Sequence, residues 1–158
     1  MNHSRSDRAG AASQPEVEAR VRDSFARQGL MRLLHAELVE VTPGRVRIDL
    51  PRRPEVSQQH GYVHAGATSA IADSAGGYAA LTLMRADFEV LTVEYKLNLL
   101  APAAGNRLEA IGTVLKSGRT LSVCQLEVYA INDEAHQPPT LVAAGQQTLI
   151  SIPGQDAS

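Results

Sequence analysis

The chain has 158 residues, of which 44% are hydrophobic and 20% charged, and its formal net charge is −2. This length suits one ordinary domain with one hydrophobic core. Because the 15 Lys and Arg residues are dispersed, we expect no nucleic-acid partner. No apolar stretch approaches the roughly 18 residues of a membrane span, and the N-terminus lacks the hydrophobic segment of a secretory signal. We therefore expect a cytoplasmic protein without a membrane partner.

The N-terminal part divides into a tail and a helix. Residues 1–14 are polar and are expected to be a disordered tail. Pro15 suits the first turn of a helix, and apolar residues then recur at helical spacing (Val17, Val21, Phe25 and Leu30). Gly29 is expected to end or bend this helix.

The rest of the chain predicts one long helix among about six strands. Residues 38–41 and 45–50 flank the turn Thr42-Pro43-Gly44 and predict a hairpin. Alternation predicts four further strands, over 88–100, 107–115, 121–131 and 141–152. Short connections favour antiparallel neighbours, so we expect an α+β fold in which a curved sheet wraps the helix. The single domain is expected to span residues 15–152, with a C-terminal tail at 153–158.

The strand at 88–100 and the one cysteine each carry an expectation. Alternation places Thr92, Glu94, Lys96 and Asn98 on a polar face, opposite Leu91, Val93, Tyr95, Leu97 and Leu99.

Cys124 lies in an apolar alternating run and has no partner for a disulfide. We expect a buried structural thiol there, and no cysteine-based metal site.

The long helix is predicted from the small and apolar residues between Ala65 and Met84. Gly76 and Gly77 lie inside it, although each mid-helix glycine costs about 1 kcal/mol relative to alanine. A helix keeps such residues where a ligand or another backbone comes close. Close packing on the sheet explains the two glycines equally well.

Candidate catalytic groups lie at two places on this helix. His64-Ala65-Gly66 stands where an irregular segment meets the helix, whose first N–H groups have no internal partner and can hold a developing oxyanion. Asp73 is an acidic residue among small and apolar ones, and such a carboxylate needs a partner or a catalytic function. Purely structural roles are also open: His64 as a helix cap, and Asp73 as the ion-pair partner of Arg85 or Arg119.

The spacing of these groups has a consequence for the assembly. Ala65 and Asp73 are eight residues apart, about 12 Å along a helix. Both cannot reach one carbonyl if catalytic contacts need about 3 Å. Either one of them is not catalytic, or the helix start of one subunit acts with Asp73 of another. The second option predicts an obligate two-fold homodimer.

The motif G-x-x-H-A-G, followed after six residues by D-S-A-G-G-Y-A-A, resembles the helix motif of PaaI-like hotdog-fold thioesterases. Residues 91–103 and the hairpin at 116–121 resemble the segments that follow in that family, so the resemblance covers roughly residues 35–151. It implies the hotdog fold with an additional N-terminal helix here, hydrolysis of acyl-CoA thioesters, and no metal or organic cofactor. It also implies a homodimer, or a tetramer made of two dimers, with active sites at the subunit interface.

The resemblance also implies roles for single residues. Asp73 matches the catalytic carboxylate, acting as nucleophile or general base, and Thr92 matches a hydroxyl that supports it. Ala65 matches the residue whose N–H polarises the thioester carbonyl, with an alanine in place of the usual glycine. His64 matches the histidine that orders this turn, and Gln58 replaces an asparagine that positions the water or thioester.

The substrate contacts are assigned less directly. Gly66 belongs to the substrate-binding helix start. By the same resemblance, a hairpin tip is the best candidate for the phosphates of CoA, and a merely solvated turn explains it equally well (Lys116, Ser117, Gly118 and Arg119). Arg85 and Arg107 are weaker candidates for that role. His60 has no counterpart with a known role and is interpreted as part of the loop.

Two other functions compete with the thioesterase. A hotdog-fold enoyl-CoA hydratase or dehydratase has a different loop before the helix, one that contains Pro and Phe. Here that loop reads Gln-Gln-His-Gly-Tyr-Val-His. A non-catalytic acyl-CoA-binding protein would need no acid, so Asp73 with Thr92 argues against it.

Overall fold

The computed structural model describes residues 12–135 and 137–154. In chain order its elements are α1 (Gln14–Arg27), α2 (Gly29–Leu34), β1 (Glu37–Thr42), β2 (Arg45–Pro51), a 3₁₀ turn (Pro54–Val56), α3 (Ala65–Leu81), β3 (Phe88–Leu99), β4 (Arg107–Ser117), β5 (Leu121–Ile131) and β6 (Thr140–Pro153). The predicted tails lie mainly outside the described residues. None of the described helices is long and apolar enough to cross a membrane.

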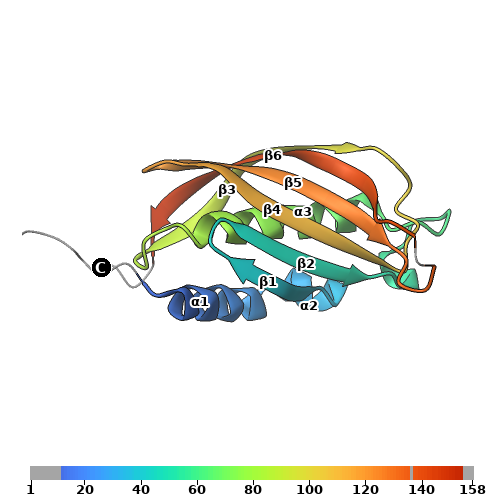
Figure 1. The fold of residues 1–158 in the computed structure, drawn as a ribbon, viewed down its shortest axis with the longest axis horizontal. Helices are drawn as coiled ribbons and strands as arrows, with labels where there is room; N and C mark the ends of the chain where they lie inside the picture. Colours follow the sequence, from blue (N-terminus) through green and yellow to red (C-terminus); the bar gives the residue numbers. More distant parts are fainter. Residues whose placement is uncertain (1–11, 136, 155–158) are drawn as a thin grey trace, which may run out of the picture.

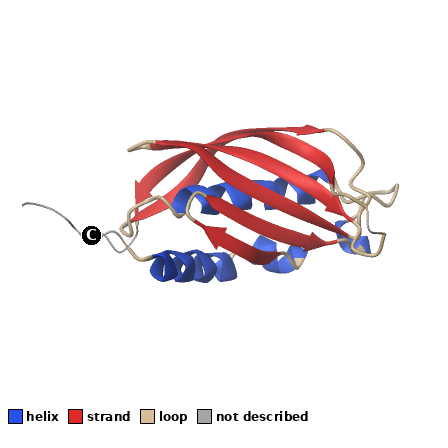
Figure 2. Ribbon diagram, in the orientation of Figure 1, coloured by secondary structure: helices blue, strands red, loops and turns tan. Residues whose placement is uncertain are grey.

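The six strands form one antiparallel sheet in the order β1-β2-β4-β5-β6-β3. The sheet curves over α3, which contacts every strand from β2 to β6 (Figures 1 and 2). The hairpin β1–β2 turns at Gly44, whose φ of 74° suits glycine. This arrangement confirms the predicted α+β hotdog fold with an additional N-terminal helix.

The central helix is buried on nearly every side because its residues are small. Ile71, Ala75 and Ala79 are fully buried against the sheet. The sheet comes closest at Gly112 of β4, where an added Cβ would collide with the backbone of Ala75 and Gly76. The absence of side-chain bulk at this crossing therefore lets the sheet close around α3.

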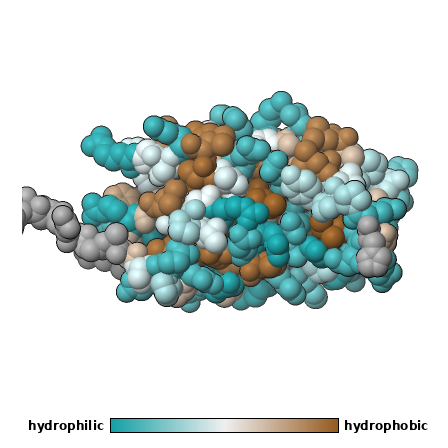
Figure 3. All heavy atoms as spheres, viewed as in Figure 1, coloured by the Kyte–Doolittle hydropathy of each residue, from teal (hydrophilic) through white to brown (hydrophobic). Residues whose placement is uncertain are grey.

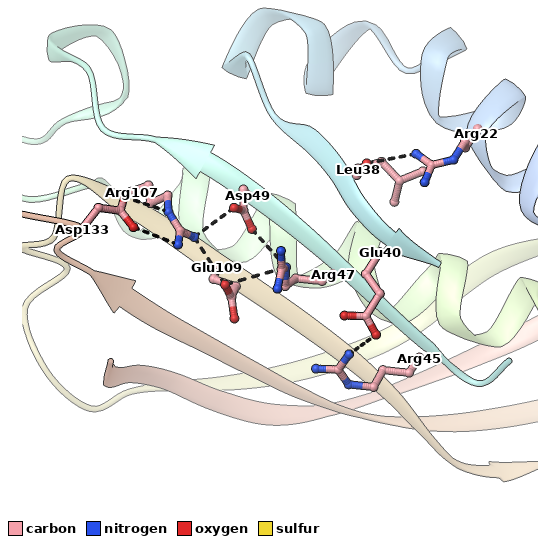
Figure 4. Close-up of polar contacts among 9 residues, drawn as sticks. All are labelled: Arg22, Leu38, Glu40, Arg45, Arg47, Asp49, Arg107, Glu109 and Asp133. Carbon is pink, nitrogen blue, oxygen red and sulfur yellow. Dashed lines mark hydrogen bonds and ion pairs between the residues drawn. The ribbon is translucent and has the colours of Figure 1, made fainter. Parts of the chain in front are cut away.

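The N-terminal helices lie beside β1, along the open side of the sheet (Figure 1). The break between them comes at Gln28, whose backbone is extended, and Gly29 opens α2 rather than ending α1. The ring of Phe25 meets that of Tyr78 edge-on, with centroids 5.9 Å apart. Arg22 donates to the carbonyl of Leu38 at 3.1 Å (Figure 4). These contacts fix α1 against both α3 and β1.

A ladder of charged side chains covers neighbouring positions on β2 and β4 (Figure 4). Arg107 pairs with Asp49 at 2.9 Å, Glu109 at 3.3 Å and Asp133 at 3.0 Å, and Arg47 lies between Asp49 and Glu109. Burial raises the pKa of the Asp49 carboxyl, although Arg107 and Arg47 oppose that shift. Since Arg107 is paired with three carboxylates, it is a weaker candidate for the phosphates of CoA.

On the face seen in Figure 3, hydrophobic patches are separated by hydrophilic residues.

Cys124 is fully buried, as expected for a structural thiol. Its Sγ donates to the carbonyl of Gly76 at 3.4 Å. Burial raises the pKa of this thiol to about 12, so the reactive thiolate is not available near neutral pH.

Candidate active site

Asp73 lies half-buried in the middle of α3, with one carboxylate oxygen held and the other open. Its Oδ1 accepts hydrogen bonds from Thr92 Oγ1 at 2.7 Å and from Gln147 Nε2 at 2.6 Å. Among the described residues no side chain donates to Oδ2, and no Lys or Arg lies within 4.0 Å of the carboxylate. The ion-pair role with Arg85 is wrong, since Arg85 pairs with Asp87 at 2.8 Å. Oδ2 is therefore placed to act on a substrate or a water molecule.

Gln147 of β6 is a third member of this group, and the sequence patterns did not point to it. It is 1% exposed, and its Nε2 also donates to Thr92 Oγ1 at 2.9 Å and to the carbonyl of Asp73 at 3.1 Å. The one signal in the sequence is an amide on the buried face of a strand, between Ala143 and Leu149. A buried amide needs hydrogen-bond partners. The NH₂ of Gln147 finds them in Asp73 and Thr92, while its Oε1 has no partner among the described residues.

The two adjacent glycines of α3 do different things. A Cβ at Gly76 would collide with Gln147 Oε1 and lie 2.6 Å from Leu126 Cδ2, so this glycine makes room for the amide that holds Asp73. A Cβ at Gly77 would meet only Leu149 Cδ2 at 3.8 Å, and Gly77 lines the cavity next to Asp73. Close packing on the sheet is thus confirmed for Gly76, and approach of a ligand stays a prediction for Gly77.

Thr92 reaches Asp73 because β3 contains a bulge. Thr92 pairs with Leu149 and Glu94 pairs with Thr148, which leaves Val93 as an extra residue. Directly opposed residues share a face, so Thr92 points towards α3 with the buried Leu149. The predicted strict alternation is therefore wrong here, since the bulge moves Thr92 away from the face of Glu94.

The start of α3 has the geometry of an anion site. His64 is the N-cap, and its Nδ1 accepts from the N–H of Gly66 at 2.8 Å. A ring that accepts at Nδ1 carries its proton at Nε2, which is then a donor. The N–H of Ala65 has no acceptor among the described residues. The capping role considered for His64 is thus confirmed, and it leaves the backbone N–H of Ala65 and the side-chain Nε2–H of His64 available.

Gln58 lies beside this turn and is partly committed to its own loop. Its backbone N–H donates to the carbonyl of Tyr62 at 2.8 Å, and its side-chain oxygen accepts from the N–H of His60. The amide NH₂ of Gln58 remains for a ligand. Gln58, His64 and Ala65 line one cavity of about 450 Å³, together with Leu99. His60 is exposed, as expected of a loop residue.

Asp73 and Thr92 line a different cavity, of about 380 Å³. It shares no residue with the cavity that contains Gln58, His64 and Ala65. Within one chain the candidate residues therefore form two separate groups. The helical spacing of Ala65 and Asp73 had led to this expectation.

The hairpin tip lies at the far end of α3 from Ala65. Ser117, Gly118 and Arg119 line a groove with Arg85, close to where α3 ends. The 17 residues of α3 put this groove about 25 Å from the helix start. Lys116 is exposed and does not line the groove.

A curved antiparallel sheet wrapped around one long helix is the arrangement of the hotdog fold. The family model described as the thioesterase superfamily matches residues 60–135. A thioesterase family protein from Silicibacter pomeroyi is 43% identical, with a TM-score of 0.83, over 87% of this chain and 99% of that one. The chain belongs to the thioesterase superfamily, and it is a thioester hydrolase.

Two further similarities agree with this assignment. The 1,4-dihydroxy-2-naphthoyl-CoA hydrolase of Listeria monocytogenes is 25% identical over 100 residues, 63% of this chain and 81% of its own. The Escherichia coli PaaI protein from the phenylacetic acid degradation operon has a TM-score of 0.76 at 18% identity, over 87% of this chain and 94% of its own. The second likeness concerns the fold and confirms the predicted PaaI-like arrangement.

Proposed function

We propose that this enzyme hydrolyses acyl-CoA thioesters to the free acid and CoA, with Asp73 as the catalytic carboxylate. The observation that carries the proposal is the carboxylate itself, which has Oδ1 held by Thr92 and Gln147 and Oδ2 open. Oδ2 either attacks the thioester carbonyl or takes a proton from the attacking water. The relative from Listeria monocytogenes, a CoA thioester hydrolase by name, supports CoA as the leaving group. The proposed chemistry uses no metal or organic cofactor.

The helix start supplies the complementary half of the chemistry. The N–H of Ala65 stabilises the oxyanion that forms when the carbonyl is attacked, at the positive end of the α3 dipole. The Nε2–H of His64 donates to the thioester or to the departing sulfur. The NH₂ of Gln58 orients the water or the thioester, and Gly66 keeps this end of the helix free of bulk.

Each complete site is proposed to combine two subunits of a homodimer. This assembly is supported by the two separate cavities and by the edge strand β3, whose one neighbour within residues 12–135 and 137–154 is β6. Leu91, Val93 and Leu99 of β3 are 55%, 57% and 59% exposed, in a 12-residue strand with an unpaired edge. Long apolar edges are normally covered, and a two-fold axis would cover both copies at once. Dimers that pair into a tetramer are compatible with the same arrangement.

The function is tested by release of free thiol from a panel of acyl-CoAs of different chain length and ring content. We expect hydrolysis of at least one class of acyl group, with no thiol release in the absence of enzyme. Hydration of crotonyl-CoA is measured beside it. Absence of thiol release from the whole panel would contradict the proposal, and hydration of crotonyl-CoA in its place would favour the hydratase.

The phosphates of CoA have two candidate partners. Arg119 on the hairpin tip is the one expected from the resemblance, and it would have to act on a site completed by a partner subunit. Arg52 is favoured by a separate observation: it lines a cleft of about 610 Å³ that shares Gln58 and Gln59 with the helix-start cavity. Arg52 has no carboxylate within 4.0 Å among the described residues, and its Nη1 donates to the carbonyl of Ala104 at 3.2 Å.

Arg119→Ala and Arg52→Ala distinguish the two possibilities. The variant that removes the phosphate ligand is expected to raise KM for acyl-CoA about tenfold, because a charge-assisted bond to phosphate is lost. The same variant should leave KM unchanged for the N-acetylcysteamine thioester of the same acid, which has no phosphate. Arg27→Ala, an exposed arginine paired with Asp23, is the matched control. Unchanged KM for acyl-CoA in both variants would contradict both assignments.

A further inference from the structure

Four hydrogen-bonding side chains gather at one wall of the Asp73 cavity, and we refer to Ser24, Gln28, Ser74 and Tyr78 as the polar wall. Gln28 Nε2 donates to the Tyr78 hydroxyl at 2.8 Å, and Gln28 Oε1 accepts from Ser74 Oγ at 3.3 Å. Ser24 Oγ lies 3.2 Å from the Tyr78 hydroxyl. Because Ser24 lies in the last turn of α1 and Gln28 is its C-cap, the N-terminal helix completes this cavity.

The polar wall has more donors than it uses internally. Gln28 has a second amide hydrogen with no acceptor among the described residues. Whichever way the bond between Ser24 and Tyr78 runs, one of the two hydroxyl hydrogens is also left over. Tyr78 is only 4% exposed, so its surroundings are largely shielded from bulk water. An oxygen atom in the cavity would accept hydrogen bonds from these groups.

The space between the polar wall and Asp73 is apolar and short. Val90, Leu91 and Leu149 line it, and Gly77 contributes no side chain. Asp73 and Tyr78 are five residues apart on α3, about 7.5 Å along the axis. Glu89 also lines the cavity, and its carboxylate disfavours an acyl group that ends in a second carboxylate. The cavity thus fits a compact, neutral group with an apolar body and an oxygen at its far end.

We propose that the polar wall selects short acyl groups that carry a hydroxyl at the end remote from the thioester. This inference rests on the proposed function, because it takes the cavity beside Asp73 as the acyl site. Gln28 and Tyr78 donate to the hydroxyl oxygen while the thioester carbonyl lies at Asp73. The polar wall recognises the hydroxyl and not the carbon skeleton, so the experiment includes both an alkyl and an aryl pair of substrates.

The test compares kcat/KM for two matched pairs of CoA thioesters. One pair is 6-hydroxyhexanoyl-CoA with hexanoyl-CoA, and the other is 3-(4-hydroxyphenyl)propanoyl-CoA with 3-phenylpropanoyl-CoA. In at least one pair the hydroxylated member should be preferred about tenfold or more, because its absence leaves buried donors unpaired. Tyr78→Phe and Gln28→Leu are each expected to bring that ratio close to one.

Phe25→Leu is the control that distinguishes recognition of the substrate hydroxyl from the packing of α1 against α3. Phe25 contacts the Tyr78 ring but does not line the cavity, so this variant should lower the melting temperature and keep the preference. Equal kcat/KM within both pairs for the wild-type enzyme would overturn the inference, as would a preference that survives both wall variants. Since the unsubstituted esters report hydrolysis by themselves, failure of selectivity is distinguishable from failure of the proposed function. Absence of hydrolysis across all four esters overturns this inference, while the wider acyl-CoA panel decides the proposed function.

Discussion

Asp73→Asn is expected to lower kcat by about 10²- to 10⁴-fold, the range for loss of a positioned catalytic base. The substitution keeps the shape of the side chain. Its amide oxygen can still accept from Thr92 and Gln147, while a non-basic NH₂ takes the place of the open Oδ2. The fold should therefore persist while the chemistry fails. The measurement is steady-state thiol release at saturating acyl-CoA, with the melting temperature recorded beside it.

Asp23→Asn is the matched control for that variant. Asp23 lies on the exposed face of α1 and pairs with Arg27, so the same chemical change there should leave kcat unaffected. If Asp73→Asn kept more than about a tenth of the wild-type kcat with an intact fold, the catalytic role of this carboxylate would be wrong.

Ala65→Pro is expected to lower kcat by about 10²- to 10³-fold, because it removes one oxyanion donor. Proline is well tolerated at the first position of a helix, where its missing N–H breaks no internal bond. The preceding residue is also compatible, since His64 has φ −63° and ψ 140°. The loss can therefore be assigned to the donor. Ala65→Gly keeps the N–H, so its kcat should lie far above that of the proline variant.

The same two variants test the shared site. If Asp73→Asn and Ala65→Pro subunits are mixed in equal amounts and exchange freely, half of the dimers are hybrids with one intact site each. About a quarter of the wild-type activity should then return. Verified hybrid dimers without any gain in activity would show that both groups act within one chain or that one of them is not catalytic.

The features that depend on local sequence were predictable. Pro15 and the turn Thr42-Pro43-Gly44 mark real boundaries because proline and glycine restrict or extend backbone freedom wherever they stand. The strand predicted over 121–131 agrees with β5, whose alternation reflects one buried face. The separation of Ala65 from Asp73 also follows from helix geometry alone, which requires no knowledge of the tertiary fold.

Features that depend on pairing between distant segments were not predictable. The bulge at Val93 arises from the register of β3 against β6, so the alternation of β3 alone placed Thr92 on the wrong face. Gln147 lies 74 residues from Asp73 and joins it only because β6 lies beside β3 in the sheet. The polar wall depends in the same way on α1 packing over the C-terminal half of α3.

The glycine pair of α3 has a consequence for how the cavity beside Asp73 can be altered. At Gly76 any side chain would collide with the Gln147 amide that holds the Asp73 carboxylate, so substitution there should disturb that group. At Gly77 a Cβ would meet only Leu149 Cδ2, in ordinary contact at 3.8 Å, so the fold should accommodate a methyl group that narrows the cavity beside Asp73. Two neighbouring positions with the same residue should thus differ sharply in how they respond to substitution. A single substitution at Gly77 is expected to reshape the proposed acyl cavity while Asp73 and the fold stay in place.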